Sequence, residues 1–200
     1  MNLLTMRTLK GLCVLVFFGL VVNAQAAYQI ATFAGGCFWC MQPPFEGIKG
    51  VVKVVAGYTG GSGKDPTYDD YARKSHLEAV QITYDPSQIT YSRLLDIFWR
   101  QIDPTDSGGQ FVDRGPQYRP AIFYHDEEQR LLAEKSRQEL GRSGRYAKPI
   151  RTEIRKAARF YPAEEYHQDY YRKSPIQYRA YRSHAGRDEY LERIWGHASH

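Results

Sequence analysis

Residues 35–40, GGCFWC, follow a short apolar stretch at residues 28–34 and constrain the fold more than any other part of the chain. The apolar stretch is typical of a buried strand, and the two glycines permit a tight turn directly after it. A short helix is expected to follow, because Pro43 and Pro44 disturb any longer one. The predicted order is therefore strand, glycine turn, cysteine, helix.

Two cysteines, Cys37 and Cys40, lie in this segment, and the third, Cys13, lies among the first 26 residues. At the start of a helix, free N–H groups and the helix dipole would lower the pKa of Cys37 and favour a nucleophilic thiolate. Cys40 would share a helix face with it, with the Cα atoms about 5 Å apart, which a disulfide tolerates. A bridge over so short a loop stabilises little, so the pair indicates redox chemistry. Buried apolar cysteines are the alternative.

The start of the chain has the pattern of an export signal. Residues 11–22, GLCVLVFFGLVV, are apolar but too short to span a bilayer comfortably, and residues 24–26, AQA, fit a signal peptidase site. We therefore expect a signal peptide at 1–26 and one mature domain at 27–200, exported to the bacterial periplasm. An uncleaved signal is the alternative, and it would provide the only membrane attachment.

The charge of the chain does not indicate a nucleic-acid partner. Loss of Arg7 and Lys10 with the signal lowers the formal charge from +5 to +3, leaving 25 basic and 22 acidic residues. Basic residues gather between 142 and 159 without a recognisable nucleic-acid motif, which favours a solvated face. We expect a monomer that binds no nucleic acid.

The rest of the chain predicts strands and helices in alternation. Strands are expected at residues 50–57, 77–84, 118–125 and 150–155, with Pro120 marking an edge or a bulge. Helices are expected from Thr90 to Ile102, from Asp126 to a stop at Gly141, and near residues 188–195. Residues 103–117 form a long loop, and such loops are commonly functional. Together these elements predict helices packed on a mixed sheet in two layers.

One carboxylate interrupts an apolar strand face. With a two-residue period, Glu78 lies on the same face as Val80, Ile82 and Tyr84. If this strand end is buried, desolvation raises the pKa of Glu78 and keeps it protonated near neutral pH, as a general acid requires. If the strand end is open to water, Glu78 is only a polar end residue.

An ordered series of motifs resembles peptide methionine sulfoxide reductase of the A type over residues 33–171. The motifs are GCFWC at 36–40, GYTGG at 57–61, PTY at 66–68, HLEAV at 76–80, DPT at 103–105, DRGPQYR at 113–119 and AEEYHQ at 163–168. The resemblance implies an α+β fold, a two-layer sandwich with a ferredoxin-like core. It also implies reduction of methionine-(S)-sulfoxide, free or in proteins, in repair of oxidative damage, without a cofactor.

The resemblance gives the reactive residues distinct roles. Cys37 would attack the sulfoxide sulfur while Glu78 protonates the oxygen. Cys37 would then be a sulfenic acid, which Cys40 converts to a disulfide.

The same resemblance implies the residues that bind the substrate. Two aromatic side chains would hold the S-methyl group, two tyrosines would donate hydrogen bonds to the oxygen, and one aspartate would orient the substrate or a water. These residues are Phe38 and Trp39, Tyr68 and Tyr118, and Asp113.

Two departures from the family pattern qualify these assignments. The segment before Glu78 is shorter than in many relatives, so Tyr71 rivals Tyr68. No cysteine follows Cys40, which makes Cys40 the only internal resolving thiol, and an exported thioredoxin-like protein the expected reductant.

The last motif also contains residues that could bind a metal. Glu164, Glu165 and His167 lack evident further ligands, so helix capping and packing are favoured and no metal is expected.

Two other functions fit parts of the sequence. A thioredoxin-like thiol–disulfide oxidoreductase explains the C-x-x-C pair but gives Glu78 and Asp113 no role. A periplasmic binding protein with tyrosines as stacking platforms leaves both thiols idle.

Overall fold

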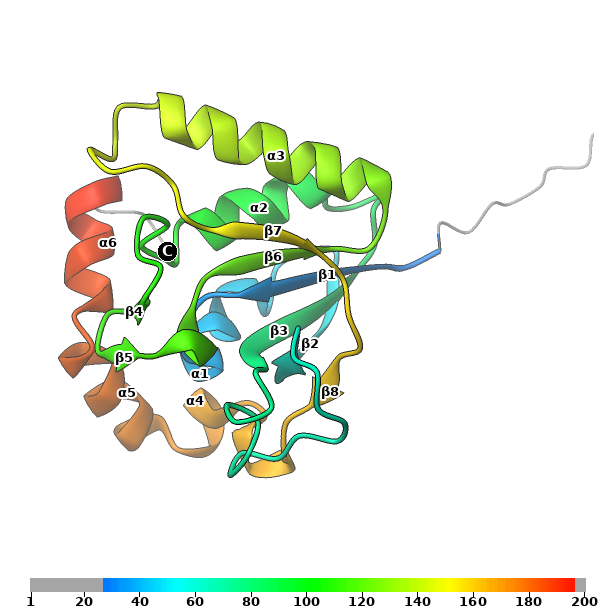
Figure 1. The fold of residues 1–200 in the computed structure, drawn as a ribbon, viewed down its shortest axis with the longest axis vertical. Coiled ribbons are helices and arrows are strands. Elements are labelled where there is room, and N and C mark those ends of the chain that lie inside the picture. The colour runs from blue at the N-terminus through cyan, green and yellow to red at the C-terminus, as the bar shows by residue number, and fades with distance from the viewer. Residues whose placement is uncertain (1–26, 197–200) are drawn as a thin grey trace, which may run out of the picture.

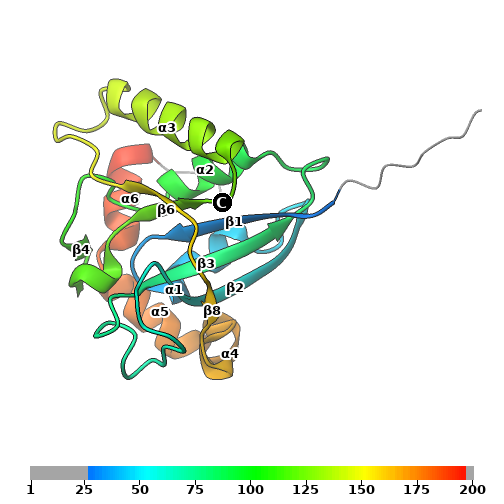
Figure 2. The same ribbon diagram turned by 45° about the vertical axis from the view of Figure 1, so that its right-hand side comes forward.

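The central element is a six-stranded mixed sheet with helices around it, which gives an α+β fold (Figures 1 and 2). The computed structural model describes residues 27–196. The expected signal peptide at 1–26, with Cys13, lies outside the described residues. Within 27–196, no helix has both the length and the apolar character needed to cross a membrane.

The sheet has the strand order β7-β6-β1-β3-β2-β8. Neighbouring strands are antiparallel except β6 and β7, which are parallel. The strands are β1 (Gln29–Ala34), β2 (Val51–Thr59), β3 (Leu77–Tyr84), β6 (Ala121–Tyr124), β7 (Glu153–Lys156) and β8 (Tyr161–Pro162). A separate hairpin pairs β4 (Gly109–Gln110) with β5 (Asp113–Arg114).

Six α-helices and three 3-10 turns complete the described fold. The helices are α1 (Phe38–Met41), α2 (Tyr91–Trp99), α3 (Glu127–Arg142), α4 (Tyr170–Lys173), α5 (Pro175–His184) and α6 (Arg187–Trp195). The 3-10 turns are η1 (Pro43–Phe45), η2 (Pro116–Tyr118) and η3 (Glu165–His167). The predicted cap of α2 is confirmed, because the Thr90 hydroxyl accepts the N–H of Arg93 at 3.2 Å.

Some predicted boundaries and positions are wrong. Pro120 marks neither an edge nor a bulge, because β6 lies between β7 and β1 and pairs with both in continuous register. Pro120 immediately precedes β6, where its missing N–H matters little and its carbonyl accepts from Glu153. Gly141 lies inside α3, which ends at Arg142. Helix α5 was not expected, since its mixed tyrosines and basic residues show no clear apolar stripe.

Alternation along the strands divides the core between the two sheet faces. On one face, Phe33 packs against Phe45 of η1 and Phe98 of α2, with ring centroids 5.7 and 4.9 Å apart. The opposite face carries the smaller cluster of Ala34, Leu77, Ala79, Ala121 and Phe123. The segment between β7 and β8 covers it with Ala157 and Phe160, and crosses the sheet as the yellow chain in Figure 1.

The register of the sheet determines where the reactive residues meet. Strand β1 is antiparallel to β3, with Phe33 opposite Val80. The end of β1, which leads through the glycine turn into Cys37, therefore lies beside the start of β3, which carries Glu78. Strand β2 adds Tyr58 directly opposite Glu78.

Candidate active site

Cys37 is the N-cap residue directly before α1, and its backbone carbonyl accepts the N–H groups of Cys40 and Met41 at 3.0 and 3.3 Å. The turn before it requires glycine at Gly36, whose φ of +83° is left-handed. A Cβ there would also lie 2.7 Å from Cβ of Gln110. The glycine turn therefore fixes the cysteine at the helix start, as the sequence predicted.

Glu78 is buried, with 2% of its surface exposed. The backbone N–H of Phe38 donates to its Oε2 at 2.9 Å, and the Tyr71 hydroxyl donates to its Oε1 at 2.8 Å. Burial raises the pKa of Glu78 to about 8, although both hydrogen bonds favour the charged form. The carboxyl is therefore protonated at neutral pH. The hydrogen bond from the N–H of Phe38, the residue that follows Cys37, holds the carboxyl close to the start of α1.

The two thiols do not ionise as the sequence predicted. Burial raises the pKa of Cys37, and the neighbouring Cys40 and Glu78 raise it further. The hydrogen bond from Cys37 lowers the pKa of Cys40 against the effect of burial. The expectation of a thiolate on Cys37 in the resting chain is therefore wrong. The physical reason is that α1 has only four residues and the Cys37 side chain caps none of its N–H groups, so desolvation prevails.

Tyr71, and not Tyr68, donates to the Glu78 carboxyl. The Tyr71 hydroxyl also lies 3.5 Å from that of Tyr118, so both phenols gather at the carboxyl. Tyr68 is 40% exposed, and its ring packs 5.9 Å from Tyr71 and 4.5 Å from His167. Of the two rivals in the sequence, the structure therefore puts Tyr71 beside the acid and Tyr68 at the rim.

Phe38 and Trp39 lie in an aromatic cluster around His167. Phe38 is buried, with its ring 5.0 Å from His167 and 5.9 Å from Tyr58. Trp39 donates from Nε1 to Nδ1 of His167 at 3.1 Å. One face of its indole stacks on Tyr170 at 3.9 Å, so a side chain from the C-terminal region covers that face.

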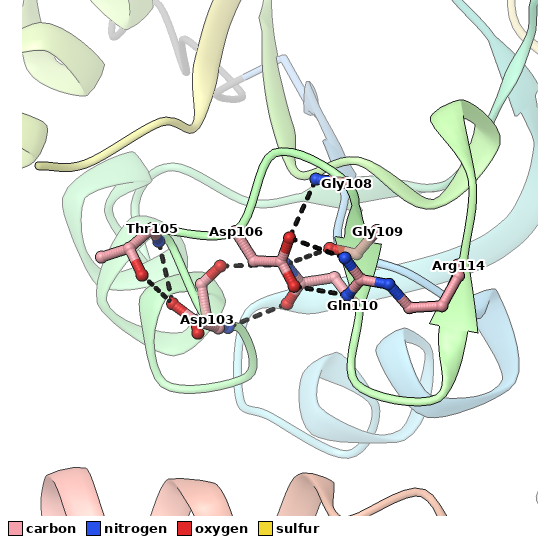
Figure 3. A network of polar contacts seen from close by, with 7 residues as sticks. All are labelled: Asp103, Thr105, Asp106, Gly108, Gly109, Gln110 and Arg114. Carbon is pink, nitrogen blue, oxygen red and sulfur yellow. Dashed lines mark hydrogen bonds and ion pairs between the residues drawn. The ribbon is translucent and has the colours of Figure 1, made fainter. Parts of the chain in front are cut away.

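The long loop is held rigidly by buried and charged side chains, and Figure 3 shows this network. Gln110 is fully buried; its Oε1 accepts the N–H of Asp103 at 2.8 Å, and its Nε2 donates to the Asp103 carbonyl at 2.9 Å (Figure 3). Arg114 forms an ion pair with Asp106, whose carboxylate also accepts the N–H of Gly108 (Figure 3). The loop is therefore a fixed frame that presents Asp113 from β5 and Tyr118 from η2.

Asp113 is partly buried, and its Oδ2 accepts a hydrogen bond from the Tyr181 hydroxyl of α5. Burial raises the pKa of Asp113, and the hydrogen bond from Tyr181 opposes that rise. The sequence pointed to Asp113 but contained no signal for Tyr181. Only the packing of α5 beside the loop brings the two together.

The acidic and histidine residues near 164–167 serve the aromatic cluster. Glu164 accepts from the Tyr58 hydroxyl and from the N–H of Tyr68, both at 2.8 Å. His167 accepts from Trp39, and burial lowers its pKa, which favours the neutral ring. Glu165 instead pairs with Lys173 at the surface. Over residues 27–196, no group of three or more acidic, histidine or cysteine side chains is arranged to hold a metal ion.

These side chains form a site with a defined chemical capacity. A pair of thiols lies next to a protonated carboxylic acid, two phenols and an aromatic cluster, all within one chain. A thiol can attack an electrophilic atom while the acid protonates the group that departs. The arrangement suits reduction of a small electrophile that gives up an oxygen atom.

Comparisons with known proteins point in the same direction. The family model described as "Peptide methionine sulfoxide reductase" matches residues 29–199. The "Peptide methionine sulfoxide reductase MsrA" of Bacillus licheniformis is 55% identical over 170 residues, covering 84% of this chain and 94% of that protein.

Solved structures share the fold. Methionine sulfoxide reductase A of Corynebacterium diphtheriae gives a TM-score of 0.66 at 30% identity, covering 78% of this chain and 79% of that one. Mxr1 of Saccharomyces cerevisiae in reduced form gives 0.69 at 31% identity, covering 74% and 87%. The same yeast protein in complex with Trx2 gives 0.52 at 24% identity, covering 76% and 91%, a likeness of fold alone.

Proposed function

Because this chain belongs to the peptide methionine sulfoxide reductase family and reduces methionine-(S)-sulfoxide to methionine, we propose that Cys37 attacks the sulfoxide sulfur while Glu78 protonates its oxygen. The observation that carries this assignment is the 2.9 Å hydrogen bond from the N–H of Phe38 to Glu78. It holds the acid against the helix start that carries the nucleophile. The proton donor and the soft nucleophile can thus both act on the S–O bond of the sulfoxide.

The first step transfers the sulfoxide oxygen to Cys37. The Cys37 thiol gives its proton to the Cys40 sulfur with which it is hydrogen-bonded, and the resulting thiolate attacks the sulfoxide sulfur. Glu78 supplies the proton for the oxygen, which passes from the substrate sulfur to the Cys37 sulfur. The S–O bond of the substrate and the transient bond between the two sulfurs both break, and methionine leaves. Cys37 gains the oxygen as a sulfenic acid, so the methionine sulfur is reduced by two electrons and Cys37 is oxidised by two.

The second step forms a Cys37–Cys40 disulfide. The sulfur of Cys40 displaces hydroxide from the sulfenic acid, and the departing oxygen leaves as water. The short loop between the two thiols supports the pairing, since residues three apart lie on one helix face. Helix α1 must partly unwind before the disulfide can close. Because α1 has only four residues, this local unwinding is feasible.

The surrounding side chains bind the substrate. Tyr71 and Tyr118 are suited to donate hydrogen bonds to the oxygen as its charge grows, with Tyr68 at the rim. Phe38 and Trp39 offer apolar contact to the S-methyl group. Asp113, held by Tyr181, orients the substrate or a water.

The fold and the cellular setting extend the proposal. The order β6-β1-β3-β2, with α1 after β1 and α2 after β3, supports a ferredoxin-like core within a two-layer sandwich. We propose that residues 1–26 are a signal peptide, that residues 27–200 form the exported domain, and that the enzyme works in the bacterial periplasm. We also propose that the enzyme acts as a monomer.

A dithiol donor must reduce the Cys37–Cys40 disulfide between turnovers. Such exchange is the chemistry of thioredoxin-like proteins, and yeast Mxr1 has been solved in complex with Trx2. An exported, thioredoxin-like donor is therefore the partner we propose.

Single-turnover assays with dabsyl-methionine-(S)-sulfoxide test the assignment. Cys37→Ser is expected to form no methionine, even with excess enzyme. Cys40→Ser, the matched control, should release one equivalent and leave a dimedone-reactive Cys37. Stoichiometric reduction by Cys37→Ser would overturn the nucleophile, and a stable sulfenic acid in the parent with Cys40 still alkylatable would overturn the disulfide.

A further inference from the structure

Arg187 is one of the largest fully buried side chains in the described chain, with 1% of its surface exposed. It is the first residue of α6, and its guanidinium donates to the Gly35 carbonyl at 3.1 Å and to the Gln101 carbonyl. Its Nη1 lies 3.6 Å from Sδ of Met41, the last residue of α1. The positive charge therefore lies under the glycine turn that leads into both thiols.

No carboxylate forms an ion pair with Arg187 among residues 27–196, and its Nε is buried without a hydrogen-bond partner. Its other contacts are Sδ of Met41 and the ring of Phe111, whose centroid lies 4.7 Å from the guanidinium carbon. A buried guanidinium with only neutral partners is costly, because they do not neutralise a full charge. Such a charge is stabilised by an anion nearby. The structure offers two candidates, Asp113 and the dithiol pair.

Asp113 is the weaker candidate, because burial raises its pKa and its hydrogen bond comes from Tyr181. Cys40 is fully buried on α1, next to Met41, which Arg187 contacts. A second guanidinium, that of Arg182, also acts on Cys40, but it is neutralised by an ion pair with Asp188.

The groups whose charge acts on Cys40 come from every element around it. They are Cys37, Glu78, Asp113, Tyr178, Tyr181, Arg182 and Arg187. Glu78 is protonated at neutral pH, and the two tyrosines are neutral because burial raises their pKa values. Asp188 neutralises Arg182, so Arg187, which forms no ion pair among residues 27–196, supplies the uncompensated positive charge at this sulfur.

We propose that Arg187 is a positioning residue that holds the negative charge of the thiol pair on Cys40 and so prepares Cys40 to resolve the sulfenic acid. The inference rests on the proposed function, in which Cys40 is the internal partner of Cys37. The Cys40 thiolate attacks Cys37–S–OH, the S–S bond forms, and the S–O electron pair leaves with the oxygen. That hydroxide takes a proton and departs as water, so Cys40 is oxidised and Cys37 is reduced.

The test is the pH dependence of Cys40 alkylation by iodoacetamide in the full chain carrying Cys37→Ser. The serine keeps a hydroxyl donor, and peptide mass spectrometry measures the alkylation of Cys40 separately from that of Cys13. Adding Arg187→Met should move the alkylation midpoint up by at least one pH unit, which means about tenfold less thiolate at pH values below both midpoints. Arg187→Lys should restore most of that shift. Arg193→Gln, on the same helix but at the surface, should have no effect.

A purely structural role would lower the melting temperature of Arg187→Met without moving the midpoint, and that result would overturn the proposal. If Arg187→Met does not fold, Arg187→Lys is compared with Arg187→Gln. Equal midpoints for these two would contradict a role of the charge.

Failure of this inference is distinguishable from failure of the proposed function. In the chain with both cysteines, the amount of disulfide formed per methionine released should fall in Arg187→Met, and dimedone trapping of Cys37 should rise. If the parent forms no disulfide at all, the resolving role of Cys40 fails, whatever the midpoint shows.

Discussion

The Tyr71 hydroxyl donates a 2.8 Å hydrogen bond to Oε1 of Glu78, while the N–H of Phe38 donates to Oε2 of the same carboxyl. Both bonds favour a carboxylate, yet burial raises the pKa of Glu78 to about 8. Hydrogen bonds therefore hold the Glu78 carboxyl between the loop that carries Tyr71 and the helix start that carries the thiols. Its proton is retained at neutral pH and can be given up when a negative oxygen appears beside it.

Glu78→Gln should slow the single-turnover release of methionine by about 10²–10⁴-fold, because the amide keeps hydrogen-bonding capacity but has no transferable acidic proton. Rapid-quench measurement with the S epimer gives the rate. The parent should lose rate above about pH 8, where the acid ionises. Glu153→Gln, a surface control on β7, should behave like the parent. A Glu78→Gln rate within threefold of the parent would reduce Glu78 to a structural residue.

The same substitution should change the dependence of stability on pH. The pKa of Glu78 is raised in the folded chain, so folding retains a proton that the unfolded chain loses above about pH 4.3. Stability from this group is present below that pH and is lost as the pH rises to about 8. Glu78→Gln should therefore gain in melting temperature relative to the parent between pH 4.5 and 8. A constant difference across this window would contradict the raised pKa.

Tyr71→Phe should shift the alkaline limit of the reaction upward. The substitution removes a donor that stabilises the Glu78 carboxylate, so the pKa of the acid should rise further. Tyr68→Phe is the matched comparison, since Tyr68 makes no hydrogen bond to the carboxyl through its hydroxyl. Single-turnover pH profiles of the two variants should differ in this limit. Identical limits would mean that Tyr71 does not control the acid.

Tyr181→Phe should raise the pKa of Asp113, because the hydroxyl that stabilises its carboxylate is lost. If charged Asp113 orients the substrate, KM should increase most at acidic pH, with less effect on the single-turnover rate at saturation. Tyr178→Phe on the same helix is the control. An unchanged pH dependence of KM in Tyr181→Phe would remove Asp113 from substrate binding.

Family membership decides between the functions that the sequence left open. The thioredoxin-like alternative explained the two thiols alone, whereas the family model covers residues 29–199 and so includes Glu78 and Asp113. The binding-protein alternative gave the thiols no role. Neither accounts for a buried, protonated carboxyl beside a dithiol pair.

Much of the fold and part of the site followed from local patterns in the sequence. A short apolar stretch identified β1, alternation of apolar residues identified β3, and Thr90 marked the start of α2. The glycine turn placed Cys37 at a helix start, and the two-residue period put Glu78 on the apolar face. These signals are readable because strand periodicity, caps and turns depend on neighbours in the chain.

Tertiary packing decided the rest. The choice of Tyr71 over Tyr68, the bond from Tyr181 to Asp113, and the burial of Arg187 under the glycine turn all join segments whose contact no local pattern reveals. The ionisation of the thiols was likewise decided by packing. A helix start alone favours a thiolate on Cys37, but burial and the neighbouring Cys40 and Glu78 raise its pKa. The pKa of Cys40 is lowered in part by Arg187, a residue far away in the chain that only the fold brings near.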